Sequence, residues 1–238
     1  MPGPAFLTAE WRDLAMLNYE IDPAVLKPLV PRGTELDAWD SRTLVSVVGF
    51  RFLDTRVRGV AIPGHRNFEE VNLRFYVRRP SDAGWRRGVV FVKEVVPRRA
   101  IAWVARQIYN ENYFAVPMRH RVAASAPAGS AAYEWLHAGR WQGLRLDFAG
   151  SPYLPHEDSE EAFVTEHYWG YARQRDGGTV EYQVEHPRWP VLRATGATLD
   201  CDVASFYGPE FACFLRGAPS SAFMAAGSTV TVRRGVRL

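Results

Sequence analysis

Alternation of apolar and polar residues between Phe68 and Arg78 constrains the fold of this chain more than any other feature. Because successive side chains of a β-strand point to opposite faces, the stretch predicts a strand whose apolar face carries Val71, Leu73, Phe75 and Val77. The other face carries Glu70, Asn72, Arg74, Tyr76 and Arg78. Charged groups need water, a partner charge or hydrogen bonds, so this polar face either meets solvent or lines a cavity. The sequence alone leaves both open.

Length and composition are typical of one large β domain. The chain has 238 residues, of which 47% are hydrophobic and 13% aromatic, including eight Trp and ten Tyr. Barrels and sandwiches of this length often form single units, and no internal repeat or linker divides the sequence. We therefore expect one domain over residues 1–238, in which some of the large amphipathic rings border a pocket.

Charge and cysteine content narrow the choice of partners and compartment. The formal net charge is +3, Lys27 and Lys93 are the only lysines, and the arginines are interleaved with acids. Nucleic-acid binders concentrate positive charge in a stripe, so we expect no nucleic-acid partner. The start of the chain lacks a signal-peptide pattern and only two cysteines occur, which favours a cytoplasmic protein. The longest uncharged run, 217–232, is too polar to span a membrane.

Local signals predict ten or more strands and few helices. Strands are expected over 14–21, 34–39, 43–53, 68–79, 85–96, 114–123, 133–138, 141–148, 167–174, 179–186, 191–199 and 221–232. Hairpin turns fall at 80–84 and 176–178. Asp22 and Ser159 are typical caps of short helices, and the apolar spacing predicts one long amphipathic helix over Arg98–Asn110. The pattern favours one antiparallel barrel or a large sandwich.

The second strand of the first hairpin is expected to alternate regularly. Regular alternation would place Val89, Phe91, Lys93 and Val95 on one face of it. The opposite face would then carry Val90, Val92, Glu94 and Val96.

Five stretches together, DPAVLKPLVP, NFEEVNLRFYVR, IAWVARQIYNENYF, EAFVTEHYWGYAR and VEHPRWPVLRA, resemble the DUF2071 family, also called YqjF-like. That family is similar in fold to acetoacetate decarboxylase, and the resemblance covers nearly the whole chain. It implies a mainly β (α+β) fold: an antiparallel, cone-shaped β-barrel with a central cavity and a few flanking helices.

The resemblance also indicates a missing group. Acetoacetate decarboxylase uses a lysine that forms a Schiff base with a β-keto acid. The resemblance places that lysine within residues 110–114, where this chain has none, and Tyr113 takes its approximate place. A phenol cannot form an imine. The pocket carboxylate of the superfamily is matched by Glu70, or less directly by Glu69.

The candidate site residues each have a structural alternative. Arg74, beside Asn72, could hold a ligand carboxylate through two parallel hydrogen bonds, and Glu70 could move a proton; a solvated strand face is the alternative. Tyr76 on the same face, and Tyr109 with Tyr113 at the end of the predicted helix, are further candidates. Aromatic packing at a helix cap is the alternative for the last two.

Other titratable groups favour structural interpretations. Lys93 between valines could be a nucleophile, but a lysine that extends from the outer face of a barrel is the preferred interpretation. Residues 166–168 with His186 could bring an acid and two imidazoles together, although structural histidines are favoured. Metal-ligand spacing and phosphate-binding, serine-hydrolase and Cys-x-x-Cys motifs do not occur in the sequence. We expect neither a metal nor another cofactor.

These observations favour a protein that binds a small anionic organic ligand in a barrel cavity without Schiff-base chemistry. One alternative is a lyase or hydrolase that acts on a keto or carboxylic acid with Glu70 as acid or base. A second alternative is a protein-interaction module. Ligand identity is not determined by the sequence, and formation of a homo-oligomer is left open.

Overall fold

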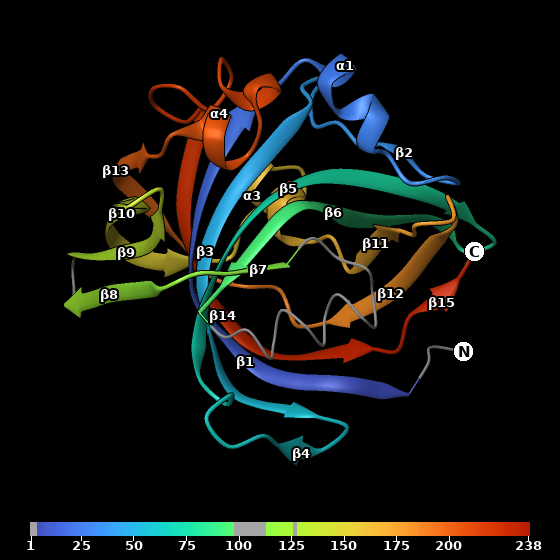
Figure 1. Ribbon diagram of the computed structural model, residues 1–238, viewed down its shortest axis with the longest axis horizontal. Helices are drawn as coiled ribbons and strands as arrows, with labels where there is room; N and C mark the ends of the chain where they lie inside the picture. The colour runs from blue at the N-terminus through green and yellow to red at the C-terminus, as the bar shows by residue number, and fades with distance from the viewer. Residues whose placement is uncertain (1–3, 98–112, 126–127) are drawn as a thin grey trace.

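All described strands of the computed structural model join one sheet, which closes on itself (Figure 1). The structure describes residues 4–97, 113–125 and 128–238. Seven strands form a closed ring in the order β12, β11, β6, β5, β3, β1 and β14, because β14 also pairs with β12. They span β1 (Ala5–Glu20), β3 (Leu44–Val57), β5 (Phe68–Ser81), β6 (Gly84–Val96), β11 (Trp169–Arg173), β12 (Thr179–Glu185) and β14 (Ser221–Arg233).

Most neighbouring strands of the ring are antiparallel. The exception among the described pairs of the ring is β6 with β11, which is parallel. From β14 the sheet continues outward through β13 (Val191–Asp200), β10 (Arg140–Tyr153), β9 (Ala128–His137) and β8 (Met118–Ser125). Short strands β2 (Glu35–Leu36), β4 (Val60–Ala61), β7 (Tyr113–Ala115) and β15 (Val236–Arg237) pair at the edges. The predicted mainly β fold is confirmed.

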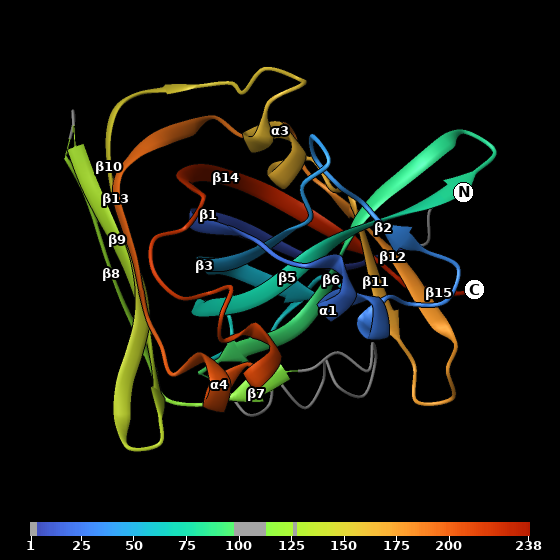
Figure 2. The ribbon, with the colours of Figure 1, turned by 90° about the horizontal axis from the view of Figure 1, so that it is seen from above.

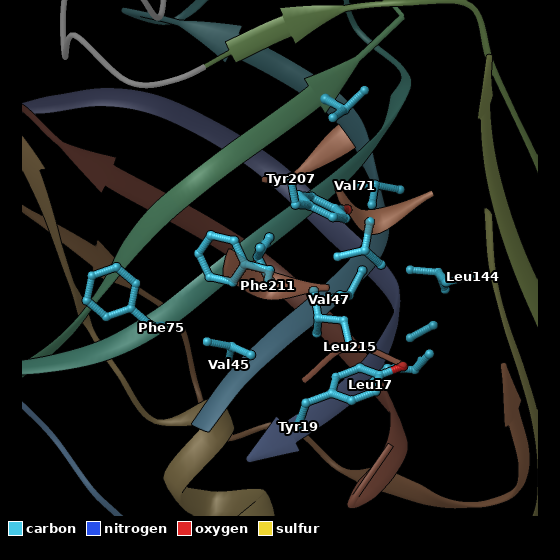
Figure 3. Close-up of a cluster of buried hydrophobic side chains, with 14 of the residues drawn as sticks. Leu17, Tyr19, Val45, Val47, Val71, Phe75, Leu144, Tyr207, Phe211 and Leu215 are labelled. Atoms are coloured by element: carbon cyan, nitrogen blue, oxygen red, sulfur yellow. The ribbon is translucent and has the colours of Figure 1, made fainter. Parts of the chain in front are cut away.

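The outward strands β8 to β10 and β13 form a layer beside the ring (Figure 2). Between this layer and the ring lies a buried apolar cluster, part of which is drawn in Figure 3. Ring strands contribute Leu17, Val45 and Phe75, and β10 contributes Leu144. The outer face of the ring is therefore buried where this layer covers it.

A second apolar cluster fills part of the inside of the ring. It includes Met16, Val48 and Phe223, together with Phe163 of the short helix α3 (Glu160–Thr165). Strand β5 lies between the two clusters, and every residue from Phe68 to Val77 is buried. From Glu70 to Arg74 the polar face of β5 is thus turned to the inside of the ring and does not meet bulk solvent, whereas Arg78 farther along the strand is partly exposed.

The hairpin of β5 and β6 contains a bulge that the sequence did not predict. Leu73 pairs with Lys93 while Arg74 pairs with Phe91, so Val92 is an extra residue in β6. An extra residue reverses the alternation beyond it. The regular faces expected for this strand are therefore wrong after Val92: Glu94 shares the inner face with Phe91, and Lys93 lies on the outer face.

Most local predictions are confirmed. Both predicted hairpins form, and Asp22 and Ser159 cap α1 (Pro23–Leu26) and α3 through backbone N–H groups of Ala24 and Ala162. Strand β1 starts at Ala5, earlier than expected, and the strand expected over 114–123 is divided between β7 and β8. The segment after residue 202, for which no strand was expected, contains α4 (Val203–Phe206). The helix expected over Arg98–Asn110, and Tyr109 with it, lies outside the described residues.

None of the helices in the described ranges is long and apolar enough to cross a membrane.

Close packing between the ring and the outer layer gives a test. A Cβ atom at Gly49 of β3 would lie 2.6 Å from Cδ2 of Tyr133 in β9. We expect Gly49→Ala to lower the free energy of unfolding by about 1–3 kcal/mol, measured by denaturant titration, because overpacking displaces the layer. Gly196→Ala is the control, since its Cβ would meet nothing closer than 3.6 Å. Equal stability of the two variants would contradict this packing.

Candidate functional site

The inside of the ring holds a cavity of about 200 Å³ to which all seven ring strands contribute. This is smaller than the ~300–1,000 Å³ of typical sites for drug-sized ligands, so it suits a small molecule. Most of the wall is apolar. Its aromatic part includes Trp11, Phe50, Phe52, Phe68, Phe91 and Trp189.

The rings of this wall are packed against one another. Trp11 makes edge contacts with Phe50 and Phe52, at centroid distances of 5.3 and 5.6 Å, and Phe52 stacks on Phe68 at 4.6 Å. Rings fixed in this way present a preformed apolar surface. The sequence did not predict which rings would meet here, because they come from separate strands and alternate with ordinary core residues.

Arg74 is a buried cation in the cavity wall. Its residue is 9% exposed, and its Nη2 donates a hydrogen bond of 3.1 Å to the carbonyl of Val164. Within the described part of the chain, no carboxylate pairs with it, and its Nε has no hydrogen-bond partner. Because burial of a charge without a partner is unfavourable, Arg74 is suited to receive an anion.

Glu70, Asn72 and Tyr113, three of the predicted residues, come together beside Arg74. Asn72 Nδ2 donates to Glu70 Oε1 at 3.0 Å, and the Tyr113 hydroxyl donates to Glu70 Oε2 at 3.2 Å. All three line the cavity. Each carboxylate oxygen of Glu70 thus accepts a hydrogen bond from a residue of the predicted site.

Glu94 is a member of the site that sequence reasoning missed. It pairs with Asn72 across the hairpin, is 1% exposed and lines the cavity. Directly opposed residues have Cβ atoms about 5 Å apart, so a second carboxyl group lies beside Asn72. Regular alternation places Glu94 on the other face of β6, and no residue type in β6 indicates the bulge at Val92 that turns it inward.

Two histidines also line the cavity, of which His167 is buried and His186 half-buried. His167 Nε2 lies 3.2 Å from Asp37 Oδ2, which also accepts a 2.7 Å hydrogen bond from Arg87 Nε. Burial lowers the pKa of His167 to about 4 against the opposing effect of Asp37. Burial opposes ionisation of Asp37 as well, but the hydrogen bonds from His167 and Arg87 hold its pKa below the usual value.

His186 stacks on Trp189 at a centroid distance of 4.0 Å, and burial, with Arg74 nearby, lowers its pKa to about 4. Both imidazoles are therefore neutral at pH 7. Arg74 is the one arginine or lysine among the described residues of the wall. The acid beside His167 is Asp37 and not Glu166, which pairs with Arg188.

The remaining candidates lie apart from the cavity wall. The Tyr76 hydroxyl is 2.5 Å from Ser46 Oγ in a buried network with Asn18, and the Tyr76 ring lies 5.8 Å from Arg74 Cζ. Tyr76 thus packs near the Arg74 guanidinium while its own hydroxyl is fixed by Ser46. Lys93 donates to the carbonyl of Phe206 and lies over the Phe206 ring, on the outer face as expected.

Comparison with known proteins gives one family. The model of the DUF2071 family, described as an uncharacterized conserved protein, matches residues 8–229. The uncharacterized protein YqjF of Bacillus subtilis (strain 168) is 26% identical over 197 residues, which cover 77% of this chain and 74% of YqjF.

Solved structures share the fold. The enduracididine biosynthesis enzyme MppR, complexed with the condensation product of pyruvate and imidazole 4-carboxaldehyde, has a TM-score of 0.69 and 11% identity, covering 100% of this chain and 90% of MppR. Acetoacetate decarboxylase from Legionella pneumophila subsp. pneumophila str. Philadelphia 1 has a TM-score of 0.66 and 12% identity, with coverage of 100% and 89%. The acetoacetate decarboxylase-like fold is therefore confirmed.

The two histidines make stability depend on pH. Between pH 6.5 and 4 they stay neutral in the folded state but take up protons in the unfolded chain. The unfolded state then binds more protons, so the free energy of unfolding falls as the pH is lowered. We expect a loss on the order of 3 kcal/mol from His167, and the shift of Asp37 acts in the same direction at lower pH.

Denaturant titrations from pH 7.5 to 4 measure this effect. His167→Gln should flatten the profile, whereas His156→Gln, at a side chain that is 82% exposed, should not. A wild-type profile that stays level between pH 6.5 and 5 would contradict histidines that are neutral in the folded state.

Proposed function

The chain belongs to the DUF2071 family, and we propose that it binds a small organic anion in its cavity, with Arg74 as the anchor. The observation that carries the proposal is the buried guanidinium of Arg74, which has no ion-pair partner among the described residues. Arginine binds carboxylates through two parallel hydrogen bonds, and its free Nε is one of the donors this geometry uses.

The shape and polarity of the cavity support the same function. A mostly apolar wall with a few convergent polar groups is typical of small-molecule sites. The similar enzyme MppR has been solved in complex with pyruvate and with the condensation product of pyruvate and imidazole 4-carboxaldehyde. We infer that the closed ring is a cone-shaped barrel of the acetoacetate decarboxylase type and that residues 1–238 form a single domain around it.

Binding is proposed to occur without a Schiff base. The two lysines of the chain are Lys27, in a short 3-10 helical turn, and Lys93. Burial lowers the pKa of Lys93, but its amine is held on the outer face by the Phe206 carbonyl and by the rings of Phe114 and Phe206. Neither lysine is part of the cavity wall.

Replacement of the anchor tests the proposal. A library of small carboxylic acids is screened by ligand-observed NMR and binders are quantified by calorimetry. Arg74→Gln should weaken binding of each by about 10- to 100-fold, because a charge-assisted hydrogen bond is lost. Arg78→Gln, on the same strand but in an exposed pair with Glu35, should leave affinity unchanged. Equal affinity of the wild type and Arg74→Gln would contradict the anchor.

A lyase or hydrolase that acts on a keto or carboxylic acid is the second candidate function. The contacts that favour it are those of Glu70, whose two oxygens accept hydrogen bonds from Asn72 and Tyr113 at the cavity wall. A carboxyl group held in this way is positioned for general acid or base catalysis.

Turnover and trapping separate this candidate from simple binding. If a bound acid is converted, Glu70→Gln should reduce kcat by about 10²–10⁴-fold while the affinity set by Arg74 persists. Borohydride added with a keto acid should leave Lys27 and Lys93 unmodified in peptide mass mapping. A reduced adduct on Lys93 would overturn the absence of imine chemistry, and full turnover by Glu70→Gln would remove its role.

A further inference from the structure

A buried acceptor beside Arg74 limits which anion the cavity can take. Asn72 is 2% exposed and lines the cavity, and its Oδ1 has no hydrogen-bond partner within the described ranges. A buried acceptor without a donor costs about 1–3 kcal/mol. Asn72 Oδ1 is therefore a place where a bound molecule gains by offering a hydrogen-bond donor.

The orientation of this amide is fixed by its neighbour. Asn72 Nδ2 donates to Glu70 Oε1 at 3.0 Å. Turning the amide over would set Oδ1 against a carboxylate oxygen, and two acceptors cannot share a hydrogen bond. The end of the amide that lacks a partner is consequently an acceptor and not a donor.

Donor and acceptor lie next to each other on one face of β5. Asn72 and Arg74 are two residues apart, which corresponds to about 7 Å along a strand. Arg74 presents N–H groups and Asn72 presents an oxygen. A single ligand that satisfies both must therefore carry a hydrogen-bond acceptor for Arg74 and a donor for Asn72. A carboxylate satisfies Arg74, and an O–H or N–H group near that carboxylate satisfies Asn72.

This complementarity discriminates between keto acids and hydroxy acids. Both oxygens of a carboxylate and the oxygen of a ketone accept hydrogen bonds, whereas a hydroxyl group also donates one. Glu70 and Glu94 add carboxyl oxygens to the same part of the wall, where Arg74 is the one cation among the described lining residues. The wall is thus rich in acceptors around one cation.

We propose that the ligand is a small hydroxy monocarboxylic acid with an apolar, preferably aromatic, body. Its carboxylate is held by Arg74, its hydroxyl donates to Asn72 Oδ1, and its body lies against Trp11, Phe50 and Trp189. This inference rests on the proposed anion-binding function. It predicts a preference opposite to that of an enzyme that must hold a ketone.

Three matched acids test the preference with the wild-type protein. Mandelate carries the hydroxyl, phenylglyoxylate carries a ketone in its place, and phenylacetate carries neither. Calorimetry should show mandelate bound about tenfold or more tightly than the other two, because only mandelate supplies the donor. In Asn72→Leu this advantage should disappear through weaker binding of mandelate alone, and in Arg74→Gln all three acids should lose affinity.

The outcomes separate the two proposals. Equal binding of mandelate and phenylglyoxylate by the wild type, as expected if water satisfies Asn72, overturns the hydroxy acid inference and leaves anion binding intact. Tighter binding of phenylglyoxylate also overturns it. If no carboxylic acid of the wider library binds, the proposed function itself fails. The wild-type comparison needs no variant, so it stands even if Asn72→Leu does not fold.

Discussion

Closure of the sheet is the constraint on which the rest of the structure depends. The pairing of β12 with β14 gives the ring an inside, and that inside is where a strand can carry charge without meeting bulk water. Strand β5 is buried on both faces for this reason. Its apolar residues fill the space under the outer layer, and Glu70, Asn72 and Arg74 become part of the wall of a cavity.

Local structure was largely predictable from residue types, because it depends on neighbours in sequence. Alternation identified β5 and its two faces, and the caps at Asp22 and Ser159 identified where short helices begin. Long-range features were not predictable in this way. The meeting of β12 with β14, the pairing of His167 with Asp37 and the partners of Tyr76 each join segments that are distant in sequence. Whether the polar face of β5 meets solvent or lines a cavity depends on such long-range contacts, which residue types do not reveal.

The chemistry of the cavity follows from what surrounds each ionisable group. Two imidazoles that could carry positive charge are kept neutral by burial, and the lysines lie outside the wall. One guanidinium remains against a set of oxygen atoms from Glu70, Asn72 and Glu94. A wall of this kind recognises the arrangement of donors and acceptors on a ligand as well as its charge.

The bulge at Val92 determines which charged side chain of β6 faces the cavity. Lys93 and Glu94 are neighbours in sequence, and the extra backbone residue before them sends the amine outward and the acid inward. A straight strand of the same composition would present the amine to the interior instead. Which of the two neighbours, Lys93 or Glu94, faces the cavity opposite β5 is thus decided by one extra residue in the backbone of β6.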